Sequence, residues 1–141
     1  MKLKKDVLLK KANAACKGNL METLGIEFIE VNKDYVVAKM PVTPKVYQPD
    51  GVLHGGATLA LAETVGSFLA QVHLDTESYS VRGIDISAQH IKSVKHGVLY
   101  ASAECVHRGR TTQVFNVRVT NEKGELVTLC KLTTISLPKQ V

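Results

Sequence analysis

Hydrophobic and polar positions repeat with two different periods along this chain, and each change of period marks a predicted element. Helical spacing occurs near the N-terminus, in a short turn before Gly25 and in a long apolar segment near the middle. It predicts helices at 6–17, 20–24 and 57–74. Runs rich in β-branched and aromatic residues, separated by polar turns, predict six strands. The predicted strands are 26–31, 35–41, 79–94, 98–106, 113–120 and 125–137.

The order of these elements indicates the fold class. Strands that precede and follow one long apolar helix, without a repeat or a linker, predict an α+β fold in which an antiparallel sheet wraps around a central helix. Because the helix at 57–74 is apolar on most sides, we expect it to be buried on most sides. With 141 residues, 45% of them hydrophobic, the chain is expected to form a single domain over 1–141.

Composition and charge narrow the classes of partner. A net charge of +5 and a pI near 9.2 favour an anionic ligand. Aromatic residues make up only 5% and no basic helix is predicted, so a small phosphorylated ligand fits better than nucleic acid. No apolar run could span a bilayer and the N-terminus lacks a signal core, which predicts a cytoplasmic protein without a membrane partner. The three cysteines lack metal-ligand spacing and are predicted to be reduced structural thiols, with no metal site.

Glu63 is the one carboxylate in the long apolar helix. Burying it without a partner would be costly, so it should be at the surface, paired or functional. Leu59 and Ser67 lie one turn away on its face, which indicates a small-walled pocket rather than a solvated stripe. Ser67 could bond the carboxylate or hold a water against it. We therefore predict that Glu63 is catalytic, with a simply exposed helix face as the alternative.

A polar and glycine-rich run, Gln48 to Gly56, precedes that helix. Amide groups at a helix start are bare, so the N–H of Gly55 could polarise a carbonyl, aided by the helix dipole. The alternative is that Gly55 and Gly56 only permit close packing. A structural role for His54 is favoured over direct proton transfer, and Gln48 is predicted to position a carbonyl or a water.

The spacing of Gly55 and Glu63 has a consequence for assembly. Eight residues of helix separate them by about 12 Å, so they cannot both touch one carbonyl carbon. If both act in one site, the two must come from different copies of the chain. A twofold dimer with two equivalent sites is therefore an obligatory part of this mechanism.

Basic residues form the last candidate group. Lys92 at a strand end, and Arg108 and Arg110 around Gly109, could bind phosphates, although each is also common in solvated turns. Strand alternation leaves open whether His90 faces inward, toward a site, or outward.

On these motifs the chain resembles the acyl-CoA thioesterases of the hotdog fold, in particular the PaaI-like and 4-hydroxybenzoyl-CoA type II branch that includes 1,4-dihydroxy-2-naphthoyl-CoA hydrolases. QPDGVLHGGATLALAETVGS (48–67) matches the signature of that branch in spacing. SAQHIK (87–92) and HRGR (107–110) fall where its later motifs lie. The similarity covers nearly the whole chain.

The resemblance implies a role for each site residue. Glu63 corresponds to the catalytic carboxylate, acting as general base on water or as nucleophile through an acyl anhydride. Gly55 corresponds to the amide that polarises the thioester carbonyl, Gln48 and His54 to positioning groups, and Ser67 to the hydroxyl near the attacking group.

The resemblance also implies how coenzyme A is held and how chains assemble. The family contacts coenzyme A partly across the subunit boundary, at positions that here are His90, Lys92, Arg108, Gly109 and Arg110. Coenzyme A is part of the substrate, and no separate cofactor is implied. Such proteins form dimers that pair into homotetramers, and the naphthoyl branch belongs to menaquinone biosynthesis. Asp50 departs from the pattern, because relatives often carry an apolar residue there, beside the acyl pocket.

The leading hypothesis is therefore hydrolysis of an acyl-CoA to a free acid and coenzyme A, with an aromatic acyl group such as 1,4-dihydroxy-2-naphthoyl as first choice. A short or medium aliphatic acyl group is the next alternative. A hydroxyacyl-thioester dehydratase is a further one, against which the set of Gln48, Gly55 and Glu63 argues. A non-catalytic acyl-CoA-binding protein is the last, and there Glu63 would be dispensable.

Overall fold

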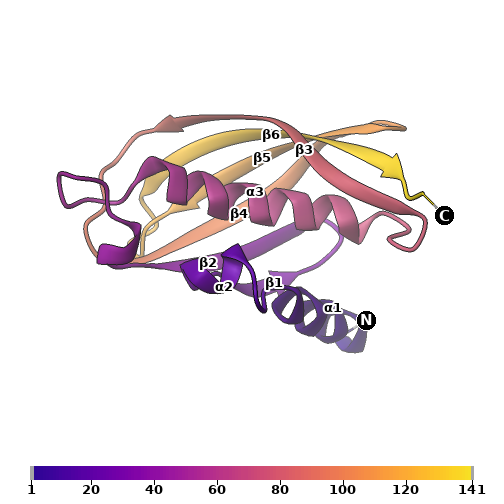
Figure 1. Ribbon diagram of the computed structural model, residues 1–141, viewed down its shortest axis with the longest axis horizontal. Coiled ribbons are helices and arrows are strands. Elements are labelled where there is room, and N and C mark those ends of the chain that lie inside the picture. The colour runs from indigo at the N-terminus through magenta and orange to yellow at the C-terminus, as the bar shows by residue number, and fades with distance from the viewer. Residues whose placement is uncertain (1, 141) are drawn as a thin grey trace.

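One antiparallel sheet lies around the long helix α3 (Gly55–Val72) in this computed structural model, which describes residues 2–140 (Figure 1). The six strands run in the order β1-β2-β4-β5-β6-β3. They are β1 (Glu27–Val31), β2 (Tyr35–Val42), β3 (Tyr79–His90), β4 (Gly97–Arg108), β5 (Thr112–Thr120) and β6 (Leu126–Pro138). The other helices are α1 (Lys2–Ala15), α2 (Leu20–Leu24) and a short 3-10 helix, η1 (Pro44–Val46). The predicted α+β fold class is confirmed.

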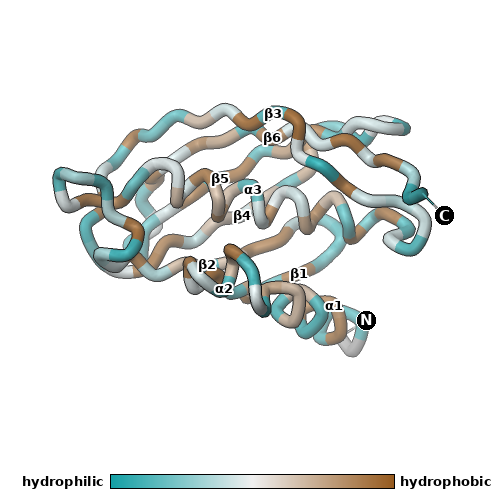
Figure 2. The backbone as a smooth tube through the Cα atoms, viewed as in Figure 1, coloured by the Kyte–Doolittle hydropathy of each residue, from teal (hydrophilic) through white to brown (hydrophobic). Residues whose placement is uncertain are grey.

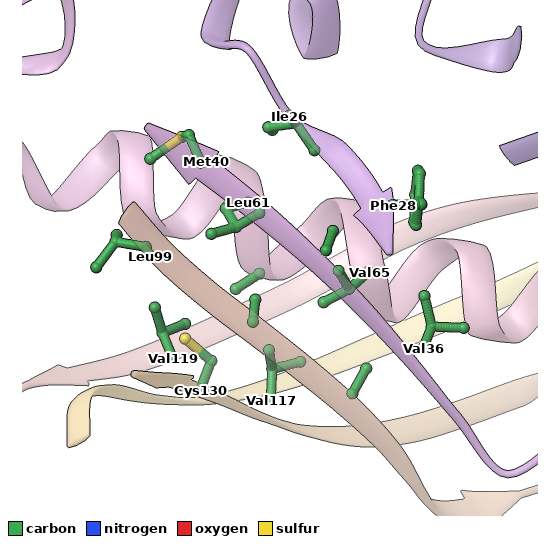
Figure 3. Packing of buried hydrophobic residues seen from close by; sticks show 14 of the residues in the cluster. Ile26, Phe28, Val36, Met40, Leu61, Val65, Leu99, Val117, Val119 and Cys130 are labelled. Atoms are coloured by element: carbon green, nitrogen blue, oxygen red, sulfur yellow. The ribbon is translucent and has the colours of Figure 1, made fainter. Parts of the chain in front are cut away.

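The core lies between α3 and the concave face of the sheet. Every second residue of the central strands points at the helix, as expected for a sheet with one buried face, and Figure 2 shows brown segments alternating with paler or teal ones along the strands. Leu61 and Val65 of α3 pack over apolar residues of four strands (Figure 3). The strand residues labelled there are Val36, Met40, Leu99, Val117, Val119 and Cys130. Gly66 allows this approach, because a Cβ there would lie 2.5 Å from Leu132 Cδ2.

The prediction that α3 is buried on most sides is wrong for the single chain. Only the face toward the sheet is fully buried, since one sheet covers only one side of a helix. The opposite face is half-buried, and it carries Leu59, Ala60, Glu63, Thr64, Ser67 and Phe68. An apolar helix face left partly open is the kind of surface that a second chain can cover.

Element boundaries differ from the predictions by a few residues. Helix α3 begins two residues early, at Gly55, because His54 caps it and compensates for the poor helix propensity of glycine. Strand β3 ends at His90 rather than at residue 94. The N–H groups of Ile91 and Lys92 both donate to Val127 O, at 2.8 and 3.2 Å, which breaks the regular ladder there.

The structure also bears on the predictions from composition. Cys16, Cys105 and Cys130 are free thiols. Burial raises the pKa of Cys130 to about 11, so it forms little of the nucleophilic thiolate at neutral pH. Within residues 2–140, no helix combines the length and apolar character needed to cross a membrane.

Candidate active site

The start of α3 presents a single free amide. His54 is the N-cap, with φ −71° and ψ 127°, and its Nδ1 accepts the N–H of Gly56 at 2.8 Å. Its carbonyl oxygen accepts the N–H groups of Ala57 at 3.0 Å and Thr58 at 3.4 Å. Among the first-turn amides, only that of Gly55 has no acceptor within the described residues. This donor is therefore available to bind an oxygen from outside the chain.

The cap gives His54 a structural role that can be measured. Replacing His54 by Ala removes the acceptor of the Gly56 N–H, and we expect the free energy of unfolding to fall by about 1 kcal/mol. His54→Asn keeps a capping oxygen and should lose much less. Urea unfolding of the three proteins checks this, and equal losses in both variants would show that the cap does not carry the effect.

A cavity of about 280 Å³ opens beside the Gly55 amide, and Gln48, His90 and Lys92 are among the residues that line it. Alternation left the direction of His90 open, and the structure places it inward. Its Nδ1 lies 3.1 Å from Thr128 Oγ1. Its Nε2 lies 2.8 Å from the position of a Cβ at Gly55, so a larger residue at 55 would force the imidazole away from the helix start.

The loop before α3 holds Gln48 in a tight turn. The N–H of Gln48 donates to Val52 O at 2.8 Å, and Gly51 supports the turn with φ 75°. The side-chain oxygen Oε1 accepts the N–H of Asp50. The amide NH₂ of Gln48 is thus the group left to bind a substrate oxygen. Asp50 is exposed and lines neither the Gly55 cavity nor the Glu63 cavity described next.

Glu63 lies in the middle of α3 with its carboxylate against Gly83 of β3. A Cβ at Gly83 would collide with Glu63 Oε1, so a larger residue here would force the carboxylate to move from this position. Sequence reasoning missed Gly83, although an isolated glycine inside a strand is a recognised sign of close approach. Ser67 lines the same cavity of about 350 Å³. The described contacts include no hydrogen bond between Ser67 and Glu63 and no ion pair of Glu63.

The two predicted catalytic groups therefore occupy separate cavities. No residue lines both the cavity at Gly55 and the cavity at Glu63. Each cavity contains one half of the predicted machinery, the amide donor in the first and the carboxylate in the second. Within one chain these halves do not meet.

The predicted coenzyme A contacts are divided in the same way. Lys92 lines the Gly55 cavity, and its Nζ pairs with Glu125 Oε2 at 2.5 Å. The hydrogen bond from Lys92 holds the pKa of Glu125 below its usual range. An anionic ligand would therefore compete with Glu125 for this ammonium group.

Arg108 ends β4, and Gly109 and Arg110 lie in the turn between β4 and β5, at the other end of the sheet. Arg108 pairs with Gln113 of β5, Gln113 pairs with Thr134 of β6, and Thr134 pairs with Gly83 of β3. Arg108 therefore lies in the same row across the sheet as Gly83, which contacts Glu63. A Cβ at position 109 would lie 2.9 Å from the backbone oxygen of Thr112, so this turn favours glycine. Within one chain this turn lies at the end of the sheet near Glu63, whereas His90 and Lys92 lie at the end near Gly55.

Comparison with known proteins shows which family has this architecture. The model of the thioesterase superfamily matches residues 50–128. The chain is 35% identical to a 1,4-dihydroxy-2-naphthoyl-CoA hydrolase of Escherichia coli over 134 residues, which cover 95% of this chain and 98% of that protein. It is 39% identical to the enzyme of the same name from Listeria monocytogenes, over 81% of this chain and 92% of that one.

A crystal structure of a thioesterase mutant from Pseudomonas aeruginosa superposes with a TM-score of 0.90. The two chains are 34% identical, and the match covers 93% of this chain and 94% of the other. With the sheet, the long helix and the free amide at its start, these matches identify the chain as a member of the thioesterase superfamily, a thioester hydrolase with the hotdog fold.

Proposed function

We propose that this protein hydrolyses an aromatic acyl-CoA in sites that each combine Glu63 of one chain with the Gly55 amide of a second chain. The observation that carries the proposal is the division of the machinery into two cavities that do not meet within one chain. A homodimer is then the smallest active unit, and pairing of two dimers into a homotetramer is part of the proposal.

The free edge of the sheet offers a way to join two chains. Within residues 2–140 strand β3 pairs only with β6, so the other edge of this twelve-residue strand is open. Ile84, near its middle, is 55% exposed. Long open edges favour pairing with another strand. An antiparallel pair of β3 strands about a twofold axis sets the Gly83 end of one chain beside the His90 end of the other. Each dimer would then contain two sites, and each site would combine Glu63 of one chain with Gly55 of the other.

The combined site accounts for thioester hydrolysis. The carbonyl oxygen binds the Gly55 N–H and the NH₂ of Gln48, and the positive end of α3 stabilises the charge that develops on it. Glu63 takes a proton from water as the water oxygen bonds to the carbonyl carbon, and the C–S bond then breaks. The thiolate of coenzyme A leaves and regains that proton.

In the alternative route a carboxylate oxygen of Glu63 attacks the carbonyl carbon itself and expels the thiolate, and water then cleaves the acyl anhydride. Neither route needs a metal or a separate cofactor, because a thioester is already an activated acyl group.

The Glu63 cavity favours an aromatic acyl group. Phe28 and Phe68 line it, with ring centroids 4.9 Å apart and planes inclined by 47°. Thr64 Oγ1 donates to Ala60 O at 2.6 Å, which leaves its oxygen to accept a bond from a ring hydroxyl. Together with the names of the relatives, this makes 1,4-dihydroxy-2-naphthoyl-CoA the first choice and menaquinone biosynthesis the proposed pathway.

The same twofold arrangement unites the basic residues. One chain supplies Glu63 together with Arg108 to Arg110, and the other supplies Gly55 together with His90 and Lys92. The twofold arrangement brings these two groups near each other. These groups then surround the phosphates of a single coenzyme A. This explains why they lie at opposite ends of the sheet in one chain.

The wall of the acyl cavity gives a test of substrate size. Ala14 and Ala15, at the end of α1, are both exposed, but only Ala15 lines the Glu63 cavity. In Ala15→Leu we expect kcat/KM for 1,4-dihydroxy-2-naphthoyl-CoA to fall at least about tenfold, since the larger side chain would occupy part of the cavity that the acyl group is proposed to fill. Acetyl-CoA should be much less affected. Ala14→Leu is the matched control, and an equal loss there would remove α1 from the acyl site.

A panel of acyl-CoA esters tests the function as a whole. Free thiol release from wild-type protein should be at least about tenfold faster, in kcat/KM, with 1,4-dihydroxy-2-naphthoyl-CoA than with acetyl-CoA or hexanoyl-CoA. A preference for hexanoyl-CoA would establish the aliphatic alternative. Binding without thiol release from any ester would instead indicate an acyl-CoA-binding protein.

A further inference from the structure

A third cavity lies away from both halves of the proposed active site. It has a volume of about 400 Å³ and opens between the first turns of α1, the β1–β2 hairpin and the end of α3. Its apolar wall includes Leu8 of α1 and Val72 of α3, together with Tyr35 of β2. It shares no lining residue with the Gly55 or Glu63 cavities. The proposed reaction therefore leaves this cavity without a role.

Asn32, at the hairpin, lines this cavity and has an unsatisfied donor. The residue is only 6% exposed. Its Oδ1 accepts the N–H groups of Asp34 at 2.8 Å and Tyr35 at 2.9 Å, and these two bonds fix which end of the amide is oxygen. The buried Nδ2 then has no acceptor among the described residues. A buried donor left unpaired is destabilising, so this position favours a bound group with an acceptor oxygen.

The charges around the cavity favour an anion. Lys4, Lys5 and Lys33 line it, against one carboxylate, that of Asp34. The first turn of α1 lies at the same place and adds the positive end of a helix dipole. The hydroxyl of Tyr35 is already used, because it donates to Glu30, so Tyr35 contributes its ring rather than a polar group.

We propose that this cavity binds a carboxylate carried on an apolar body. The carboxylate accepts from Asn32 Nδ2 and is neutralised by the lysines, and the apolar body packs on Leu8, Val72 and the ring of Tyr35. An inorganic anion would satisfy the charges but leave the apolar wall uncovered. A neutral apolar molecule would cover the wall but leave the amide donor unpaired.

Occupancy of this cavity has a structural consequence for α1. The same helix contributes Lys4, Lys5 and Leu8 to this cavity and, two turns later, Ala12 and Ala15 to the wall of the Glu63 cavity. A ligand that joins the first turns of α1 to the β1–β2 hairpin therefore also steadies one wall of the proposed acyl site.

Decanoate is a suitable probe, measured by calorimetry and by crystallography of wild-type protein. We expect a carboxylate oxygen within hydrogen-bond distance of Asn32 Nδ2 in the crystal. Decanol, which has the same apolar body without the charge, and acetate, which has the charge without the body, should each bind at least about tenfold more weakly. Decanoate found only in the Glu63 cavity would overturn the proposal.

Two variants and two controls assign the binding. Asn32→Asp keeps the oxygen that accepts from Asp34 and Tyr35 but removes the donor, and it should weaken decanoate binding at least about tenfold. Lys5→Glu, a surface change that leaves the hairpin intact, should weaken it as well. Lys10→Glu makes the same charge change on α1 outside the cavity, and Ala15→Leu alters only the acyl cavity. Unchanged affinity in Asn32→Asp and Lys5→Glu, or equal losses in the two controls, would contradict the assignment.

Discussion

Glu63→Gln is expected to lower kcat for thioester hydrolysis by a factor of about 10²–10⁴, the usual contribution of a positioned general base. The substitution keeps the shape of the side chain and removes its ability to take a proton or to attack carbon. Glu63 is half-buried beside Gly83, and its carboxylate has no ion pair among the described contacts. The variant should therefore be at least as stable as wild type. Initial rates of thiol release, with urea unfolding of both proteins, measure the two effects separately.

The matched control is Glu104→Gln, which removes an exposed carboxylate on β4 that lines neither cavity. It should retain wild-type turnover. Turnover by Glu63→Gln within twofold of wild type would remove Glu63 from the mechanism and would favour a different catalytic group. A loss of both turnover and stability would show that the carboxylate acts on the fold instead.

Gly55→Pro is expected to reduce kcat by a factor of about 10²–10³, the cost of losing one donor to a developing oxyanion. Proline removes the only first-turn N–H of α3 that has no acceptor within the described residues. The helix should survive, because proline is favoured at the first helical position. The ψ of 127° at His54 also suits a residue that precedes proline. Circular dichroism and thiol release together check the result.

Gly55→Ala separates the lost donor from added bulk. It keeps the N–H and places a Cβ 2.8 Å from His90 Nε2, so it introduces a comparable steric conflict. We expect its kcat to stay well above that of Gly55→Pro, with most of its loss in KM. Equal kcat values in the two variants would mean that crowding of His90, rather than the amide, accounts for the loss.

The two proposed catalytic groups could be selected from local patterns because their evidence is local. A carboxylate in an apolar helix and a glycine pair at a helix start are visible within a single segment. Their separation along one helix is set by its rise per residue, so the proposal that two chains share each site also followed from the sequence. The structure adds that only the Gly55 amide, of those in the first turn, is free.

Features that depend on how segments meet could not be predicted in this way. The inward direction of His90 depends on its pairing with Thr128, because strand alternation alone permits either face. The close contact of Gly83 with the Glu63 carboxylate joins positions that are twenty residues apart in the chain. An apolar helix pattern does not reveal whether the covering surface comes from the same chain or from another, which is why the burial of α3 was overestimated.

The central claim, that each site is shared by two chains, is tested most directly by mixing two inactive proteins. Chains carrying Glu63→Gln and chains carrying Gly55→Pro are co-expressed with different tags, and the heterodimers are counted by native mass spectrometry. With random pairing, half of the dimers are mixed and each contains one intact site, so activity should return to about one quarter of wild type. If mixed dimers form and thiol release stays at the level of the separate variants, the shared site is contradicted.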